Sequence, residues 1–148
     1  MTYNLNHFIR EFTGITMTLD WLALAAHAPE IRILPISTRC ELGQLYTPWR
    51  EKADGSYADG WCEAAEPLRV NSVRFPDRCE HELSEFPYRS ETLKIPCYEL
   101  PNGEYLILDG NQRAVSLFRS KCSINVEAWI IKGPIDQGIM PDLGKWQR

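Results

Sequence analysis

One stretch in the second half of the chain, residues 105–121, constrains the fold more than any other, because its hydrophobic pattern changes at a glycine. An apolar run up to Leu108 is typical of a strand, and the helical period that follows places Ala114, Leu117 and Phe118 on one face. Gly110, between the two patterns, permits a sharp turn because glycine adopts backbone conformations closed to other residues. The predicted order is a strand over 105–108, a turn at Asp109-Gly110, an N-cap at Asn111 and a helix over 112–121.

The junction at Gly110 predicts an anion-binding site. A turn that leads directly into a helix directs unpaired amide N–H groups and the positive end of the helix dipole at one point. Phosphates bind at such points, and Arg113 in the first helical turn adds a planar cationic donor. The residues expected to contact phosphate are Gly110, Asn111, Gln112 and Arg113. The alternative is a plain strand–turn–helix junction with a solvated arginine.

The flanking segments indicate a mixed α/β sheet around this junction. Asn102-Gly103 is a strong hairpin signal, and it predicts a hairpin over residues 95–108 that shares a sheet with a strand over 124–131. The elements predicted upstream are helices over 4–12 and 19–28, the second capped by Thr18, and a strand over 31–36. The predicted fold class is α+β, a single domain with a small sheet, a hairpin–helix–strand core and N-terminal helices.

The segment from Leu42 to Pro67 reads as a long loop, with Trp49 and Trp61 among glycines and charges. Loops of this length in a compact domain are usually functional or mobile. The two indoles could stack on a nucleotide base or bind a protein partner, or they could pin the loop to the body of the fold. A short helix is predicted over residues 77–86, where we interpret His81 as an exposed residue.

Composition limits the functional classes. A net charge near −4 argues against nucleic acid as the main partner. No apolar run approaches the length of a membrane span and no signal-peptide pattern begins the chain, so a cytoplasmic protein is expected. Five cysteines at wide spacings without a C-x-x-C pair favour neither a zinc cluster nor a disulfide framework, so no metal site is predicted.

The segment Asp109-Gly110-Asn111-Gln112-Arg113, followed by Ala114, resembles the glycine–arginine signature of the ParB/sulfiredoxin-like superfamily. The resemblance covers residues 93–131, where hairpin, motif helix and strand follow one another in the same order. It implies that the turn and the arginine hold the phosphates of a bound nucleotide, ATP or CTP, with Mg²⁺ as an accompanying ion. It also implies that the strand over 31–36 ends near this pocket and brings residues 37–41 to it.

The departures from this family restrict the chemistry that can be expected. Asn111 stands where sulfiredoxins carry the reactive cysteine, so sulfiredoxin activity is not expected. Asn111 and Gln112 replace the glutamate and arginine of the ParB CTPases. The free serine kinases share Asp109, Gly110 and Arg113, but Gln112 replaces a histidine that could act as a base. The candidate catalytic carboxylates are therefore Asp109 and, more remotely, Glu41.

Two hypotheses follow. The first is a nucleotide-binding ParB-like protein that transfers or hydrolyses a phosphoryl group. The second is a catalytically inert ParB-like binding module that acts as an inhibitor, an immunity-type protein or a regulator through protein–protein contacts. In either case the expected organisation is a helical part over 1–30, an insertion or lid over 42–92, the motif core over 93–131 and a loose tail over 132–148.

Overall fold

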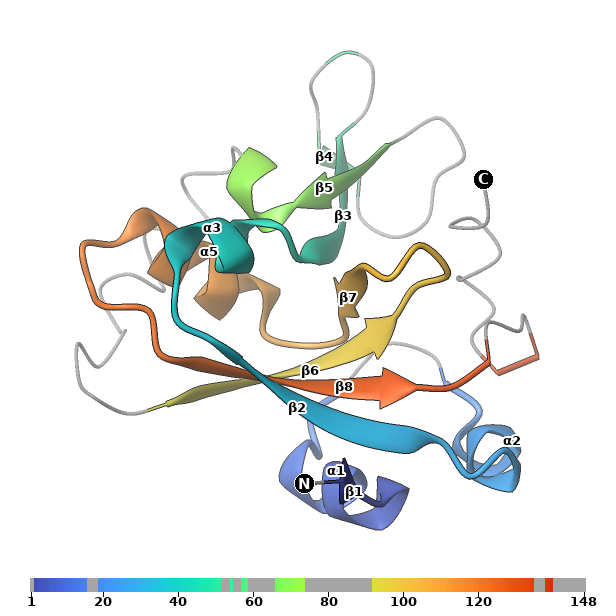
Figure 1. Ribbon diagram of the computed structural model, residues 1–148. Coiled ribbons are helices and arrows are strands. Elements are labelled where there is room, and N and C mark those ends of the chain that lie inside the picture. Colours follow the sequence, from blue (N-terminus) through green and yellow to red (C-terminus); the bar gives the residue numbers. More distant parts are fainter. Residues whose placement is uncertain are drawn as a thin grey trace.

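A computed structural model describes residues 2–15, 19–51, 54, 57–58, 66–73, 92–134 and 138–139. These residues form one mixed sheet of eight strands, in the order β1-β2-β8-β6-β7-β3-β4, with β5 paired to β3 (Figure 1). The chain is therefore of the α+β class that the sequence predicts. Among the described residues, no helix is long and apolar enough to cross a membrane.

The centre of the sheet is β8 (Val126–Lys132), which pairs antiparallel with β2 (Glu30–Ile36) and parallel with β6 (Leu93–Glu99). β6 turns back antiparallel into β7 (Tyr105–Ile107). At the far edge of β2 lies the short strand β1 (Thr2–Tyr3). The hairpin and the strand after the motif helix thus share one sheet, which confirms that prediction.

Helices cover both faces of this sheet (Figure 1). On one face lie α1 (Leu5–Glu11) and α2 (Trp21–Ala26), and on the other lie α3 (Arg39–Gly43), α5 (Asn111–Arg119) and the 3-10 turn η1 (Val70–Ser72). Two buried clusters correspond to the two faces. The α5 cluster includes Ile36, Leu45, Trp49, Ala114 and Leu117, and the α1 cluster includes Leu5, Phe8, Leu24 and Ile31. Along β8 the side chains alternate between them, so that Ala128 and Ile130 meet the α5 cluster while Trp129 and Ile131 meet the α1 cluster.

The hairpin turn closes over Pro101, Asn102 and Gly103. The amide of Gly103 donates to the carbonyl of Leu100 at 3.0 Å, and the amide of Leu100 donates to the carbonyl of Glu104 at 2.7 Å. Gly103 has φ +81°, a left-handed conformation in which a side chain is strained. The Asn-Gly signal therefore marks the hairpin correctly, but the loop contains one more residue than a two-residue turn.

The prediction of a long loop over 42–67 is wrong for the described part of that segment. It contains β3 (Tyr46–Glu51), β4 (Tyr57–Ala58) and β5 (Glu66–Arg69), of which β3 joins the main sheet through a parallel pairing of Tyr46 with Leu106. The alternating pattern of a strand is obscured because the β3–β5 register shifts between Tyr46 and Arg50. Within this shift, the buried hydroxyl of Thr47 donates to the carbonyl of Leu68 at 2.8 Å.

Two helix caps differ from the prediction. The second helix begins at Trp21 with Asp20 as its N-cap, whose Oδ1 accepts from the amide of Ala23 at 3.0 Å, so the helix starts later than a Thr18 cap requires. The motif helix is capped by Gly110, and Asn111 is its first helical residue. In both cases a neighbouring residue takes the non-helical conformation that a cap needs.

Other predictions have mixed outcomes. The helix over 4–12 and the strand over 31–36 are confirmed as α1, capped by Asn4, and β2. After β8, residues 133–134 and 138–139 are described and lie outside any helix or strand, and the predicted loose tail is otherwise outside the described residues. Ile139 is buried, and its carbonyl accepts from the amide of Asp20 at 2.7 Å. The predicted helix over 77–86, with His81, and the side chain of Trp61 lie outside the described residues.

Candidate phosphate-binding site

The candidate site lies where β7 passes through Asp109-Gly110 into α5. Gly110 has φ +86° and ψ 23°, a left-handed conformation that only glycine adopts without strain. The first amide bonded within the helix is that of Ala114, which donates to the carbonyl of Gly110 at 3.0 Å. The amides of Asn111, Gln112 and Arg113 therefore have no intrahelical acceptor, and no described side chain caps the helix.

Arg113 folds back over this turn. Its Nη2 atom lies 3.3 Å from the position that a Cβ on Gly110 would occupy, and its Nε atom lies 3.8 Å from the same position. Arg113 is exposed and forms no ion pair or hydrogen bond with any residue that the structure describes. The guanidinium and the helix N-terminus therefore present positive charge and unpaired donors on the same side of the turn.

A cavity of about 250 Å³ opens at this point. Its described lining consists of Trp49, Asp109, Gly110, Asn111, Gln112 and Arg113. The four residues predicted to bind phosphate are thus brought together, and Trp49 reaches them from β3, far away in the sequence. Trp49 is 6% exposed and packs in the α5 cluster, so its ring offers little surface to a protein partner. Trp49 can therefore anchor β3 to the body of the fold and also form a wall of the cavity.

Asp109 supplies the one carboxylate of the described lining. Its Oδ2 atom lies 3.6 Å from the position of a Cβ on Gly14, so the turn that follows α1 approaches the motif from the other side of the sheet. Nothing in the sequence around Gly14 indicates this approach, because it depends on how α1 packs against the sheet.

Asn111 carries an unusual feature. Its side-chain oxygen is buried and has no hydrogen-bond partner among the residues that the structure describes. Since Gly110 takes the cap position, this oxygen has no helix amide to accept from, although the sequence predicts that it would cap. An unpaired buried acceptor costs about 1–3 kcal/mol, and an atom of this kind in a native structure calls for an explanation such as strain, a bound water or ion, or a functional role. Sequence patterns contain no signal for it.

Glu41 is not part of this cavity. It lies in the first turn of α3, where its Oε1 atom accepts from the hydroxyl of Thr38 at 2.7 Å, and it lines a second cavity instead. Arg39, two residues before Glu41, explains why Glu41 lies apart from the first cavity. The guanidinium of Arg39 donates to the carbonyls of Phe118, Ser120 and Cys122 at the C-terminal end of α5. α3 is thus fixed to the end of α5 that is remote from Gly110, about 13 Å along the helix.

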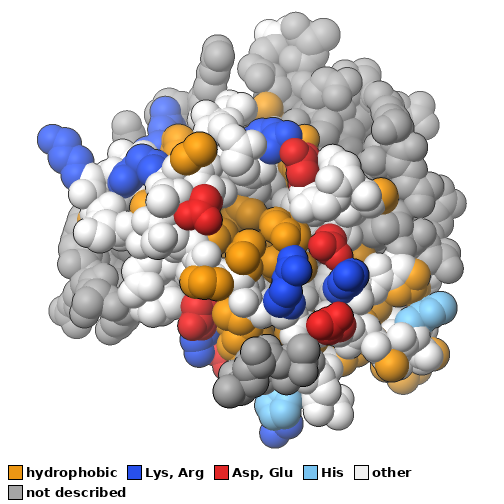
Figure 2. All heavy atoms as spheres, viewed as in Figure 1, with side chains coloured by type: hydrophobic (Ala, Val, Ile, Leu, Met, Phe, Trp, Pro, Cys, Tyr) orange, Lys and Arg blue, Asp and Glu red, His pale blue; other side chains and the backbone are white. Residues whose placement is uncertain are grey.

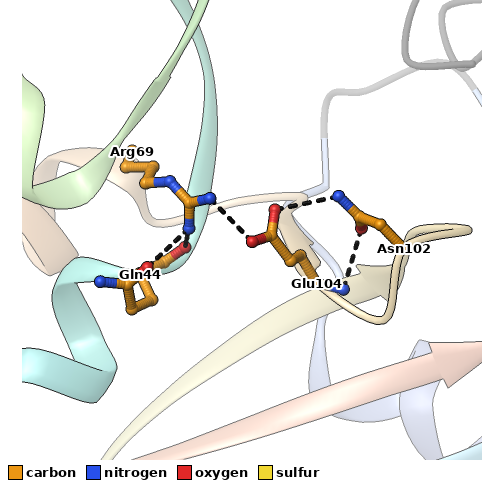
Figure 3. A network of polar contacts seen from close by, with 4 residues as sticks. All are labelled: Gln44, Arg69, Asn102 and Glu104. Carbon is orange, nitrogen blue, oxygen red and sulfur yellow. Dashed lines mark hydrogen bonds and ion pairs between the residues drawn. The ribbon is translucent and has the colours of Figure 1, made fainter. Parts of the chain in front are cut away.

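A polar network that the sequence does not reveal fixes β3 and β5 to the hairpin (Figure 3). The guanidinium of Arg69 donates to Oε1 of Glu104 at 2.7 Å, to Oε1 of Gln44 at 2.7 Å and to the carbonyl of Gln44 at 3.0 Å. It also lies over the ring of Tyr46, 4.4 Å from the centroid. The amide nitrogen of Asn102 donates to Oε2 of Glu104 at 3.1 Å.

This network determines how two of its groups ionise. Partial burial raises the pKa of the Glu104 carboxyl, but hydrogen bonds from Arg69 and Tyr46 and the charge of Arg69 outweigh burial, so the net pKa is lowered. Burial raises the pKa of the Tyr46 hydroxyl, and its hydrogen bond to Glu104 raises it further. Glu104 is therefore ionised and Tyr46 neutral at pH 7, so the Arg69–Glu104 ion pair is present under ordinary conditions.

The described cysteines differ in exposure. Cys97 on β6 is fully buried, and desolvation raises the pKa of its thiol far above the usual range, so it remains a protonated, unreactive core residue. Cys122 is half-buried and Cys40 exposed. The described residues contain no group of three or more His, Cys, Asp or Glu side chains arranged to hold a metal ion.

Comparison of the chain with protein-family models, with curated proteins and with solved structures found no match.

Proposed function

We propose that this chain is a ParB-like nucleotide-binding protein that holds the phosphates of ATP or CTP at the N-terminus of α5. The observation that carries the proposal is the convergence on one cavity of the Arg113 guanidinium and three amides that have no acceptor among the described residues, next to a glycine in a left-handed conformation. Backbone donors, dipole and a planar cation are together the means by which proteins bind phosphate. The order of hairpin, motif helix and strand supports the ParB-like assignment.

The cavity also supports a role for Trp49 and for Mg²⁺. A buried indole in the wall offers an apolar surface on which the base or the sugar of a nucleotide can pack. Mg²⁺ is usually bound by one or two carboxylates together with substrate phosphates and water. Asp109 alone fits that requirement, and the bound ion would neutralise phosphate charge beside the carboxylate.

A binding module without turnover is the second candidate. A phosphoryl-transfer enzyme needs a group that orients or deprotonates the acceptor, in addition to any group that holds the metal ion. Asp109 is the one carboxylate in the described lining, and Glu41 belongs to another cavity. This distribution favours an inhibitor, immunity-type or regulatory protein that responds to nucleotide without consuming it.

The test is calorimetric titration of ATP, CTP and inorganic phosphate, with and without Mg²⁺, into the wild type and three variants. Arg113→Ala should weaken binding about ten- to a hundredfold, because it removes charge-assisted hydrogen bonds. The affinity of Arg113→Lys should lie between those of the wild type and Arg113→Ala, because lysine keeps the charge but loses the planar fork. Arg119→Ala removes the same charge from the last turn of the same helix and should leave affinity unchanged.

Equal affinity of the wild type and Arg113→Ala would contradict the proposal, as would the absence of heat with every anion. Circular dichroism and thermal melting establish that each variant is folded. Release of phosphate from bound ATP or CTP, measured over hours, separates the two candidates: turnover that disappears in Asp109→Asn indicates an enzyme, and tight binding without turnover indicates the module.

A further inference from the structure

A second cavity, of about 310 Å³, lies on the α3 side of the sheet and shares no described lining residue with the first. It lies between α3, β2 and the tip of the β6–β7 hairpin. Its described lining consists of Leu34, Ile36, Glu41, Gln44, Leu45, Gly103, Glu104 and Tyr105. Figure 2 shows hydrophobic side chains gathered at the centre of this face, with charged side chains of both signs around them. We refer to this second cavity as the hairpin groove.

The floor of the hairpin groove is apolar and fixed in position. Ile36 and Leu45 are buried in the α5 cluster, and Leu34 packs against that cluster. The ring of Tyr105 forms one wall, and its hydroxyl accepts from the guanidinium of Arg32 at 2.8 Å, so the ring cannot rotate out without breaking this bond. A rigid apolar floor of this kind suits a compact hydrocarbon or aromatic group.

The charged groups around the floor are unequally compensated. Glu104 is paired with Arg69 at 2.7 Å, and Arg32 lies 3.8 Å from Glu99. Glu41 accepts from the Thr38 hydroxyl, but no Lys, Arg or His nitrogen of the described residues lies within 4.0 Å of its carboxylate. Counted over the described residues, the lining therefore carries one negative charge in excess, at the edge of an apolar surface.

We propose that the hairpin groove binds a small organic cation, an ammonium or amidinium group attached to a compact apolar body. The apolar body fills the floor formed by Leu34, Ile36 and Leu45, and the cation pairs with Glu41. A cation leaves water for an apolar cavity only when a carboxylate meets it, so the unpaired charge selects the sign of the ligand. Ligands without the positive charge gain the apolar contacts alone.

Three probes of nearly equal shape test the sign of the charge: 2-phenylethylamine, 2-phenylethanol and 3-phenylpropanoate, titrated at pH 7 and followed by changes in protein amide NMR signals. The amine should bind about two- to fivefold more tightly than the alcohol, the range that a partly exposed ion pair supports, and the carboxylate should bind most weakly. The shifted signals should include those of Leu45 and Tyr105.

Two variants locate the site. Glu41→Gln retains an acceptor for the Thr38 hydroxyl and should bring the affinity for the amine down to that for the alcohol. Leu34→Arg places a tethered cation in the groove and should abolish amine binding. Glu30→Gln removes an exposed carboxylate from the start of the same strand and serves as the matched control, which should behave as wild type.

The proposal is overturned if the amine binds no more tightly than the alcohol, if Glu41→Gln leaves the preference intact, or if none of the three probes binds. The proposal does not depend on the phosphate site, since the two cavities share no described lining residue. Arg113→Ala should therefore reduce the affinity for nucleotide and leave the affinity for the amine unchanged. Loss of amine binding in Arg113→Ala, with the fold intact, would also count against a separate groove.

Discussion

At the scale of single residues, Glu104 connects the ionisation of the protein to its stability. Its carboxylate accepts from Arg69, Tyr46 and Asn102, and these donors come from three different parts of the sheet. Because the carboxylate is shared in this way, protonation weakens contacts of the hairpin with both β3 and β5.

We expect Glu104 to make the protein more stable at neutral pH than at low pH. The pKa of this carboxyl in the folded state is lowered from an ordinary value of 4.5, so its stabilising contribution is complete above about pH 4.5 and is lost as the pH falls towards the folded-state pKa. The free energy of unfolding of the wild type should exceed that of Glu104→Gln at pH 7, and the difference should shrink as the pH falls below 4.5 and through the folded-state pKa.

Urea denaturation of both proteins at several pH values provides this comparison. Glu30→Gln, which removes a carboxylate outside the network, should show no such convergence. A constant difference between the wild type and Glu104→Gln from pH 7 to pH 3 would show that the charge of Glu104 does not stabilise the fold.

The residue scale also shows which parts of the site the sequence determines. Gly110 and Arg113 lie in one local motif, so the turn at Gly110 and the place of Arg113 in the first helical turn follow from local sequence, without knowledge of the rest of the chain. Trp49 could be identified as a candidate but not placed, because its position depends on β3 pairing. Arg69 and Glu104 could not be linked at all, since two strand pairings that the sequence did not predict bring them together.

At the scale of elements, β3 places Trp49 in the α5 cluster. We expect Trp49→Ala to lower the free energy of unfolding by about 3–5 kcal/mol, the usual cost of truncating a buried tryptophan. Leu22 on α2 is 86% exposed, and Leu22→Ala should stay within about 0.5 kcal/mol of the wild type. Chemical denaturation monitored by circular dichroism measures both.

A small effect of Trp49→Ala on stability would mean that the indole is not an anchor and would leave the cavity wall as its main role. Trp49→Phe keeps an aromatic surface and should preserve the fold. It is therefore the variant in which to measure nucleotide affinity, and a decrease there would support contact between the ring and the bound base or sugar.

Arg39 determines how α3 meets α5. Its guanidinium spans the last carbonyls of α5, where a positive charge also compensates the negative end of the helix dipole. Arg39→Lys should cost about 1–2 kcal/mol, because the charge remains while the planar arrangement that reaches several carbonyls is lost. Arg119→Lys, on the exposed side of the same last turn, should have little effect in the same denaturation experiment.

The elements predicted well are those with strong local signals. The hairpin has Asn102-Gly103, α5 begins directly after Gly110, and β8 contains the apolar run from Ala128 to Ile131 between two covered faces. β3 is different, because Pro48 and the register shift near Thr47 remove the period-two pattern on which a prediction depends. Its strand character comes from the neighbours that pair with it, and local sequence does not encode neighbours.

At the scale of the whole molecule, the sheet should be most stable at its centre. β8 forms seven residue pairs with β2 and six with β6, whereas β4 forms two pairs, both with β3. We expect the amides of β8 to exchange with deuterium most slowly and those of β4 to exchange near the rate of an open chain. Hydrogen exchange followed by NMR gives these rates, and rapid exchange in β8 would contradict the sheet order.

The central position of β8 has a further consequence for the order in which the protein is made. β2 ends at Ile36 and β6 at Glu99, but the strand that joins them begins only at Val126. On the ribosome, both strands emerge with an open edge facing the place that β8 will fill, and open edges attract other chains. The nascent protein is therefore expected to need protection from aggregation until its last strand closes the middle of the sheet.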